Sequence, residues 1–300
     1  MKVMITGAGG QLGHELARTA PDGVNCLMLD RSMLDITDAE AVMRMLINER
    51  PEVVINTAAY TAVDKAETER DLAHAVNAEG AGNLARAAAE INAYLVHLST
   101  DFVFDGQASR PYAPQAEPAP LGVYGASKLE GELRVQAALG NQALILRTAW
   151  LYSCHGHNFV KTMLRLMRER DELSVVADQI GTPTWAYALA CAIWCATTMR
   201  ITGIHHWTDA GVASWYDFAV AIAAKGHALE LIERLPRVRP IRTEDYPTPA
   251  KRPHYSVLDK TSTWRALGYP SRHWQESLDL MLRELAASKI SAEEGACLGS

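Results

Sequence analysis

The chain has 300 residues, of which 48% are hydrophobic and 21% are charged, and its formal net charge is −6 at pH 7. That is enough chain for one large or two modest domains with a full core, and it excludes a disordered protein, a collagen and a small disulfide scaffold. Because the net charge is negative, the chain as a whole does not attract polyanions. We therefore expect no nucleic-acid partner and no binding to an anionic membrane.

The N-terminus and the cysteines both indicate in which cellular compartment the protein works. The chain opens on Met-Lys-Val-Met-Ile without a long apolar h-region, and no apolar run approaches the roughly 18 residues that a membrane span needs. The cysteines are odd in number and have no framework spacing; they are Cys26, Cys154, Cys191, Cys195 and Cys297. Free thiols are typical of a reducing compartment, so we expect a cytoplasmic protein.

In the first half of the chain, short apolar runs alternate with helical patterns, which is the rhythm of β-α-β units. In chain order we expect a strand over Lys2–Thr6, a helix over Gln11–Ala20, a strand over Val24–Leu29, a helix over Asp38–Glu49, a strand over Val53–Asn56, a helix over Asp71–Ile91, a strand over Tyr94–Ser99, a proline-rich loop over Gln107–Val123, a helix over Gly125–Leu139 and a strand over Ala143–Leu146. These strands are apolar on both faces, which indicates a buried parallel sheet. Residues 1–150 are therefore predicted to form an α/β domain, a Rossmann-like doubly wound parallel sheet that binds a dinucleotide.

Beyond Trp150 the rhythm loosens. We expect helices over Asn158–Arg170, Tyr187–Thr198, Ser214–Lys225 and His273–Ala287, a strand over Leu173–Val176, and a proline- and arginine-rich connection over Leu235–Pro253. Residues 151–287 are predicted to be a smaller α/β region that mainly binds substrate, with some elements returning to the sheet. Residues 288–300 are predicted to be a tail that frays.

Three glycines follow the first strand and open the first helix: Gly7, Gly10 and Gly13. Glycine suits these positions because the turn is tight and the backbone must approach a pyrophosphate closely. The helix N-terminus then presents free N–H groups and the positive end of its dipole to the phosphates. The glycine pattern, placed between a strand and a helix, predicts a dinucleotide site.

The end of the second strand bears on the choice of dinucleotide. Asp30 stands near the usual separation of an acid that binds the adenosine ribose hydroxyls, which favours NADH. Arg31 beside it fits a 2′-phosphate, which favours NADPH. Asp35 and Ile36 are placed to flank the adenine through a polar and an apolar contact. The cofactor is therefore predicted to be NADPH or NADH, with the choice between the two left open.

Tyr124 and Lys128 form a Y-x-x-x-K pair at the entry to a helix, where residues four apart lie on one face. An adjacent ammonium stabilises a phenolate, so we expect the pKa of Tyr124 to be lowered toward the working range. Thr100 supplies a hydroxyl at the carboxyl end of the fourth strand, the edge where ligands bind in open α/β sheets. Thr100, Tyr124 and Lys128 are therefore the predicted catalytic residues.

Together these motifs resemble the extended short-chain dehydrogenase/reductase family. Finer marks of one branch, the reductases of nucleotide-linked 4-keto-6-deoxysugars, follow in the expected order from Met1 to about Leu285. They are Asn56–Glu67, Arg147–Tyr152, Asn158–Val160, Asp178–Thr184 and Arg252–Asp259, whereas Ser99–Gly106 belongs to the motifs of the wider resemblance.

The resemblance implies a hydride transfer from a nicotinamide to the 4-keto carbon of dTDP-6-deoxy-L-lyxo-4-hexulose, giving dTDP-L-rhamnose. It implies that Tyr124 protonates the carbonyl oxygen, that Lys128 tunes Tyr124 and binds the nicotinamide ribose, and that Thr100 hydrogen-bonds the same oxygen. The cofactor residues that it implies are Gly10, Gln11, Leu12, Asp30, Asp35, Ile36, Ala59, Tyr60 and Thr61, beside Gly7 and Arg31. The expected substrate residues are Thr100, Asp101, Trp150, Asn158 and Arg252, with the Arg252 guanidinium suited to a diphosphate.

Well-described members of this family hold a magnesium ion between two subunits through acidic residues. Glu15 matches the first of these, but Tyr187 stands where another acid is expected. We therefore predict no metal site and leave a homodimer open.

Two other functions stay open. One branch that resembles the family is a non-catalytic, NADP-binding regulatory subunit of a methionine adenosyltransferase. A related nucleotide-sugar epimerase, dehydratase or reductase is the other alternative. The presence of Thr100, Tyr124 and Lys128 favours chemistry over regulation.

Overall fold

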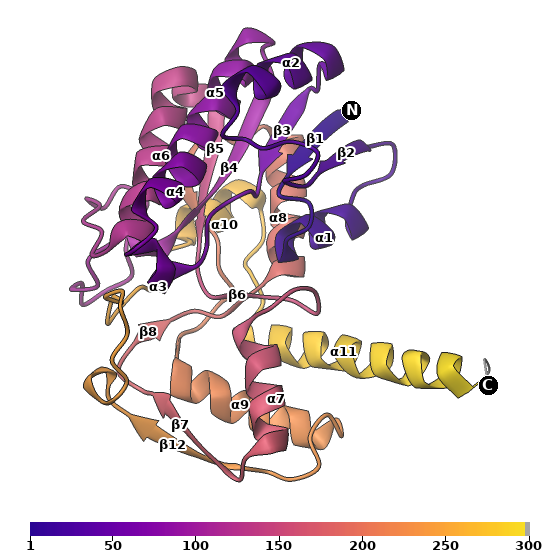
Figure 1. Ribbon diagram of the computed structural model, residues 1–300, viewed down its shortest axis with the longest axis vertical. Coiled ribbons are helices and arrows are strands. Elements are labelled where there is room, and N and C mark those ends of the chain that lie inside the picture. Colours follow the sequence, from indigo (N-terminus) through magenta and orange to yellow (C-terminus); the bar gives the residue numbers. More distant parts are fainter. Residues whose placement is uncertain (298–300) are drawn as a thin grey trace.

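A six-stranded parallel sheet forms the centre of the chain (Figure 1). The computed structural model describes residues 1–297. Across the sheet the strands are β10 (Gly203–His206), β5 (Ala143–Thr148), β4 (Tyr94–Thr100), β3 (Val53–Asn56), β1 (Lys2–Thr6) and β2 (Asn25–Leu29). The chain moves from β1 to β2 on one side and then to β3 on the other, so the winding reverses between β1 and β3. Ligands of open α/β sheets bind at the carboxyl ends of strands beside such a reversal.

Helices cover both faces of this sheet, as the two-sided apolar strands predict (Figure 1). Side chains alternate between the faces: Val3 and Ile5 point to one core, and Met4 between them points to the other. The first face carries α1 (Gln11–Arg18), α8 (Ala186–Met199) and α10 (Thr261–Leu267), and the second carries α2 (Ala39–Glu49), α5 (Ala81–Glu90) and α6 (Val123–Leu139). The predicted α/β class and doubly wound sheet are confirmed.

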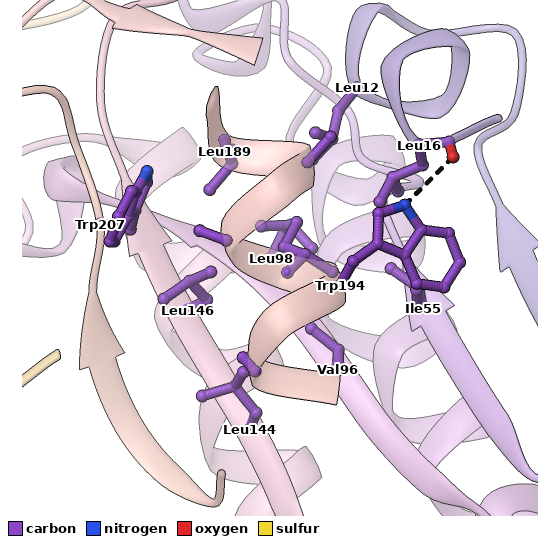
Figure 2. Close-up of a cluster of buried hydrophobic side chains, with 14 of the residues drawn as sticks. Leu12, Leu16, Ile55, Val96, Leu98, Leu144, Leu146, Leu189, Trp194 and Trp207 are labelled. Carbon is purple, nitrogen blue, oxygen red and sulfur yellow. Dashed lines mark hydrogen bonds between the residues drawn. The ribbon is translucent and has the colours of Figure 1, made fainter. Parts of the chain in front are cut away.

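Helix α8 crosses the first face of the sheet and packs on side chains of β3, β4 and β5 (Figure 2). Trp194 of this helix is 3% exposed, and its indole Nε1 donates a hydrogen bond of 3.2 Å to the carbonyl oxygen of Leu16 in α1. Strand β10 follows α8 and pairs in parallel with β5. Elements beyond residue 150 thus complete both the edge and one face of the sheet.

The remaining elements build a second core below the sheet in Figure 1. Its helices are α7 (Phe159–Glu169), α9 (Trp215–Ala228) and α11 (Trp274–Cys297), and its strands β7 (Glu172–Val176) and β12 (Arg237–Ile241) pair in parallel. Two further short pairs are β6 (Leu151–Tyr152) with β9 (Thr184–Trp185), and β8 (Ile180–Gly181) with β11 (Ala213–Ser214).

Several features differ from the expected elements. The expected helix over Asp71–Ile91 is divided into α4 (Arg70–His74), a π-helical segment over Ala75–Gly80, and α5. The expected connection Leu235–Pro253 contains β12, in which Pro240 is tolerated at the edge of a small sheet. Strand β10 and helix α10 were not expected at all, and α11 continues past the expected end at Ala287.

The wider π-helical segment has a local consequence, because it points Asn77 inward between two other segments. The Asn77 side chain accepts a hydrogen bond from the backbone N–H of Tyr60 (2.8 Å) and donates one to Ser127 Oγ (3.0 Å). Short helix α3 (Val63–Ala66) follows Tyr60 in the same loop. The segment after β3 is thereby fixed against α6.

Within the described residues, no helix combines the length and the apolar character that a bilayer crossing requires. Cys26, Cys154, Cys191 and Cys195 are free thiols. Residues 298–300 and the side chains beyond Ser288, including that of Cys297, lie outside the described part of the chain, so the fraying of the tail stays a prediction.

Candidate active site

A cleft of about 1090 Å³ opens where β1, β3, β4 and β5 end. Pockets for small ligands commonly have roughly 300–1,000 Å³, so this cleft is large enough for a ligand the size of a dinucleotide. The predicted residues that line it are Gly7, Gly10, Gln11, Leu12, Asp30, Arg31, Asp35, Ile36, Ala59, Tyr60, Thr61, Thr100, Asp101, Tyr124, Lys128, Trp150 and Arg252. The structure therefore brings all but one of the predicted cofactor and substrate residues to one cavity.

The glycine loop at one end of the cleft has the shape that a pyrophosphate needs. Gly7 has a φ of +73°, and a Cβ there would lie 2.6 Å from the backbone nitrogen of Ala58 in the loop after β3. Helix α1 starts at Gln11 behind the N-cap Gly10, and no side chain caps its first N–H groups. A dinucleotide phosphate fits this cradle, because these N–H groups are free to donate to an anion.

The adenosine end of the cleft carries charges of both signs. Asp30 accepts hydrogen bonds from the backbone N–H groups of Ser32 (2.8 Å) and Met33 (3.1 Å) and from the Ser32 hydroxyl (2.6 Å). The Ser32 hydroxyl bond is the main cause that lowers the pKa of this carboxyl, so Asp30 is an anion at neutral pH. The Arg31 side chain is 74% exposed and lies 3.6 Å from Asp35. Asp30, which could accept hydrogen bonds from ribose hydroxyls, and Arg31, which could bind a 2′-phosphate, are therefore neighbours at this end of the cleft.

Thr100 and Asp101 lie at the point where β4 ends and a short 3₁₀ turn, Asp101–Val103, begins. The Thr100 hydroxyl donates to Asp101 Oδ1 (3.1 Å) and accepts from the Phe102 N–H (3.2 Å). Burial raises the pKa of Asp101 to about 6, against the effect of hydrogen bonds with Ser256 and Thr100. Both side chains are thus held rigidly at the floor of the cleft.

Tyr124 enters the cleft from the first turn of α6. Gly125 permits this approach, because a Cβ at Gly125 would lie 2.1 Å from the Phe102 carbonyl oxygen. Removal from water raises the pKa of Tyr124 to about 12, although a hydrogen bond with Thr100 pulls it down. The predicted lowering of this pKa by Lys128 is therefore wrong in direction. A raised pKa keeps the phenol protonated at neutral pH, which is the state that a proton donor requires.

Lys128 is 3% exposed, and its ammonium reaches the sheet. Nζ donates a hydrogen bond of 2.6 Å to the Leu98 carbonyl oxygen in β4. Burial lowers the pKa of Lys128 to about 8, and the negative charge of Glu132 opposes this shift. The side chain is therefore cationic at neutral pH, and it reaches from α6, which also carries Tyr124, to the end of β4 in the wall of the cleft.

Two stacked indoles form the other end of the cleft. Trp150 has a left-handed backbone (φ +47°), and its ring stacks on that of Trp215 at 3.6 Å with an interplanar angle of 7°. A Cβ on Gly181 would lie 2.5 Å from the Trp150 ring, so this glycine leaves the space that the indole fills. Trp150 was expected to stack on a hexose, and one of its faces is instead covered by Trp215.

Arg252 and Asn158 have close partners within the protein. Arg252 donates to both carboxylate oxygens of Asp64, at 3.0 and 2.7 Å, so part of its charge is already balanced. The Asn158 amide donates to Gln11 Oε1 (2.9 Å), and Asn158 Oδ1 caps the N-terminus of α7. Asn158 is not among the residues that line the cleft. It reaches the cleft only through Gln11.

Glu15 matches the first acidic magnesium ligand of the related proteins. Its side chain is fully buried, and it does not line the cleft. Its carboxylate accepts hydrogen bonds from Ser153 (2.6 Å) and from Arg18, and the Arg18 guanidinium lies over the Tyr187 ring at 4.6 Å. Among the described residues, no three acidic, histidine or cysteine side chains gather to hold a metal ion.

Sequence reasoning missed several cleft residues. Trp215 and His157 line the cavity from the region after residue 150, and Asp64 orients Arg252. Trp215 opens α9 behind Ser214, whose capping box with Asp217 predicts the helix start but not the side chain's position. No local sequence pattern indicates that these residues lie at the cleft; their position becomes apparent only in the folded structure.

Comparisons with known proteins agree with this geometry. Residues 1–287 match the family model described as the RmlD substrate binding domain. A dTDP-4-dehydrorhamnose reductase of Aggregatibacter actinomycetemcomitans is 45% identical over 285 residues, which cover 92% of this chain and 97% of that protein. The crystal structure of a dTDP-4-dehydrorhamnose reductase from Clostridium acetobutylicum has a TM-score of 0.90 at 44% identity, covering 95% of this chain and 99% of that one.

A second crystal structure bears on the cofactor. The dTDP-4-dehydrorhamnose reductase of Bacillus anthracis, solved in complex with NADP, has a TM-score of 0.88 at 40% identity and covers 94% of this chain and 99% of that one. From the matched model and these relatives, the chain belongs to the RmlD family of dTDP-4-dehydrorhamnose reductases, within the extended short-chain dehydrogenases/reductases.

Proposed function

We propose that this chain is an NAD(P)H-dependent oxidoreductase that reduces the 4-keto group of dTDP-6-deoxy-L-lyxo-4-hexulose to give dTDP-L-rhamnose. The observation that carries the proposal is the single cleft in which the glycine loop, Thr100, Tyr124 and Lys128 meet. The relatives named above support the nucleotide sugar as substrate.

The catalytic roles follow from the geometry of three side chains. Tyr124, kept protonated by its raised pKa, donates its phenolic proton to the ketone oxygen. Thr100 supports the same oxygen with its hydroxyl, and donors fixed in place act most strongly on the charge that develops there in the transition state. Lys128 holds a positive charge beside them and binds the nicotinamide ribose. The nicotinamide, when bound, supplies the hydride.

The cofactor would be held along the cleft by the residues of the glycine loop and the adenosine end. Gly7, Gly10, Gln11 and Leu12 would hold the pyrophosphate, and Asp30, Arg31, Asp35 and Ile36 would hold the adenosine half, with Ala59, Tyr60 and Thr61 also lining the cofactor's part of the cleft. The sugar lies against Thr100, Asp101 and Trp150. Arg252 reaches the diphosphate, and Asn158 acts through its bond to Gln11.

A panel assay tests the proposed function. The purified chain is mixed with dTDP-linked 4-keto-6-deoxysugars and with NADPH or NADH, and loss of the reduced nicotinamide is followed together with the C4 configuration of the product. We expect stoichiometric oxidation and dTDP-L-rhamnose. Retained nucleotide without net oxidation would favour an epimerase or dehydratase, and binding of an adenosyltransferase without turnover would favour the regulatory role.

The exposed Arg31 provides a test of cofactor choice. Replacing Arg31 by alanine is expected to raise the KM for NADPH about tenfold, because a charge-assisted bond to a phosphate contributes roughly 1.5–3 kcal/mol and exposure reduces it. The KM for NADH should stay within about twofold, since Arg31 faces no phosphate in that cofactor. Steady-state kinetics with both cofactors give the comparison.

Arg44→Ala is the control for that variant, because Arg44 is 65% exposed on α2, pairs with Glu40, and does not line the cleft. Equal changes in the two KM values of Arg31→Ala would contradict the assignment of Arg31 to the 2′-phosphate.

Four broader expectations remain proposals. Residues 1–150 act as the dinucleotide-binding part and residues 151–287 mainly as the substrate part, followed by the 288–300 tail. The chain works in the cytoplasm, without a nucleic-acid partner or a membrane, and a homodimer is its simplest assembly. Sedimentation analysis at several concentrations measures that last point.

A further inference from the structure

Three successive residues of β4 each meet one residue of α6, and the three helix residues are spaced four apart. Thr100 and Tyr124 line the cleft together, the Leu98 carbonyl oxygen accepts from Lys128 Nζ, and Ser99 Oγ donates to Glu132. Residues four apart lie on one face of a helix, so this face of α6 docks on the end of β4 as a unit. Tyr124 and Lys128 are the proposed catalytic pair, and the third member has no role yet.

Glu132 is 1% exposed and is the most heavily bonded carboxylate at this junction. Besides the Ser99 hydroxyl, it accepts from Arg147 Nε (2.9 Å) and from a terminal nitrogen of Arg147 (2.6 Å) in β5. Arg147 is itself 1% exposed, donates to the Pro114 carbonyl oxygen (3.3 Å) and lies over the Phe104 ring at 5.1 Å. One carboxylate therefore ties α6 to β4 and β5, directly beneath the cleft.

The charges around Lys128 single out Glu132. Of the groups that face this junction, His97 of β4 is fully buried, and burial together with the charge of Lys128 lowers its pKa, so it is neutral. His206 of β10 is likewise neutral, because burial lowers its pKa to about 3. Asp101 acts on Tyr124, and Arg147 is paired with Glu132. Glu132 is thus the anion that opposes the loss of the proton from buried Lys128.

We propose that Glu132, fixed by Arg147 and Ser99, is a positioning residue of the reductase that keeps Lys128 cationic and holds α6 in register with Thr100. The proposal rests on the proposed function, because it assigns Glu132 a role only through Lys128. Buried ion pairs often contribute little to net stability. A role in the active site would therefore account for the Glu132–Arg147 pair better than a role in folding alone.

The test is the pH dependence of turnover in Glu132→Gln, which keeps the shape of the side chain and removes its charge. The alkaline limb of kcat in the original chain should reflect Lys128, whose pKa is about 8, since activity is lost as pH rises and the ammonium loses its proton. Without the carboxylate the ammonium loses its proton more easily. We expect the limb to move to lower pH by about one unit, the size of effect an adjacent opposite charge has.

Glu130→Gln is the matched control, because Glu130 lies on the same helix, 38% exposed, and bonds to Arg134 and His74 rather than to the site. Its alkaline limb should coincide with that of the original chain. A readout without turnover comes from the NMR titration of the Lys128 side-chain carbon signal, assigned by its loss in Lys128→Ala. That signal should also titrate at lower pH in Glu132→Gln.

The outcomes separate the inference from the function on which it rests. An unmoved alkaline limb and unmoved Lys128 titration in Glu132→Gln, with Lys128→Ala inactive, would overturn the role of Glu132 and leave the reductase in place. Full activity in Lys128→Ala would overturn the roles of Lys128 and Glu132 while leaving the reductase in place, whereas no oxidation of NADPH or NADH by the original chain with the keto sugar would overturn the reductase itself. If Glu132→Gln does not fold, Glu132→Asp draws the carboxylate away from Lys128 by one methylene. A smaller shift in the same direction then supports the proposal, and no shift overturns it.

Discussion

Phenylalanine in place of Tyr124 is expected to lower kcat for reduction of the 4-keto sugar by about 10²–10⁴-fold, the usual contribution of a positioned proton donor. The phenol is the group in the cleft that combines a raised pKa with a hydrogen bond to Thr100, so its loss leaves the developing alkoxide without its proton. The dissociation constant of NADPH, measured by fluorescence titration, should change less than about threefold, because the ring and its edge contact with Phe102 remain.

Tyr246→Phe removes the same atom from a side chain that is 61% exposed and outside the cleft, and it should turn over normally. Turnover by Tyr124→Phe at the rate of that control would end the assignment of Tyr124 as the proton donor.

Alanine in place of Trp194 is expected to lower the free energy of unfolding by about 3–5 kcal/mol, the range for removing a buried tryptophan. The indole fills the space between α8 and α1 on the first face of the sheet and satisfies the Leu16 carbonyl (Figure 2). Urea denaturation followed by circular dichroism measures the change. Because Trp194 does not line the cleft, the KM values of the folded fraction should stay close to those of the original chain.

Met199→Ala is the comparison for that variant, since Met199 ends the same helix and is 52% exposed. A surface substitution of this kind changes stability by about 0.5 kcal/mol or less. If both variants unfolded at the same urea concentration, the packing of α8 on the sheet would not contribute the stability assigned to it.

The parts of the molecule that could be predicted are those encoded locally. Val3, Met4 and Ile5 are apolar in succession, which marks a strand buried on both faces. The glycine loop and the pair Tyr124 and Lys128 are read from short spacings, and the structure brings both to one cleft. These patterns could be read from the sequence because strand and helix geometry alone decides which nearby residues share a face.

The parts that escaped prediction depend on contacts between distant segments. Asp64 and Arg252, or Trp150 and Trp215, meet only because the chain beyond residue 150 folds back over the sheet. Strand β10 is short and contains two histidines, so its residues give no strong strand pattern by themselves. The pKa of Tyr124 was predicted in the wrong direction because removal from water raises it, the charge of Asp101 raises it further, and only a hydrogen bond with Thr100 opposes them.

The late position of α8 in the chain has a consequence for synthesis on the ribosome. Strands β1 to β5 are complete at Thr148, but α8, which covers Val96 and Leu144 on their first face, ends only at Met199, and the edge strand beside β5 only at His206. At about 5–20 residues per second, several seconds pass in which Val96, Leu144 and their neighbours have no cover. The nascent chain therefore exposes an apolar surface to chaperones during that interval, and we expect a chain that ends between β5 and α8 to aggregate rather than to form a working half.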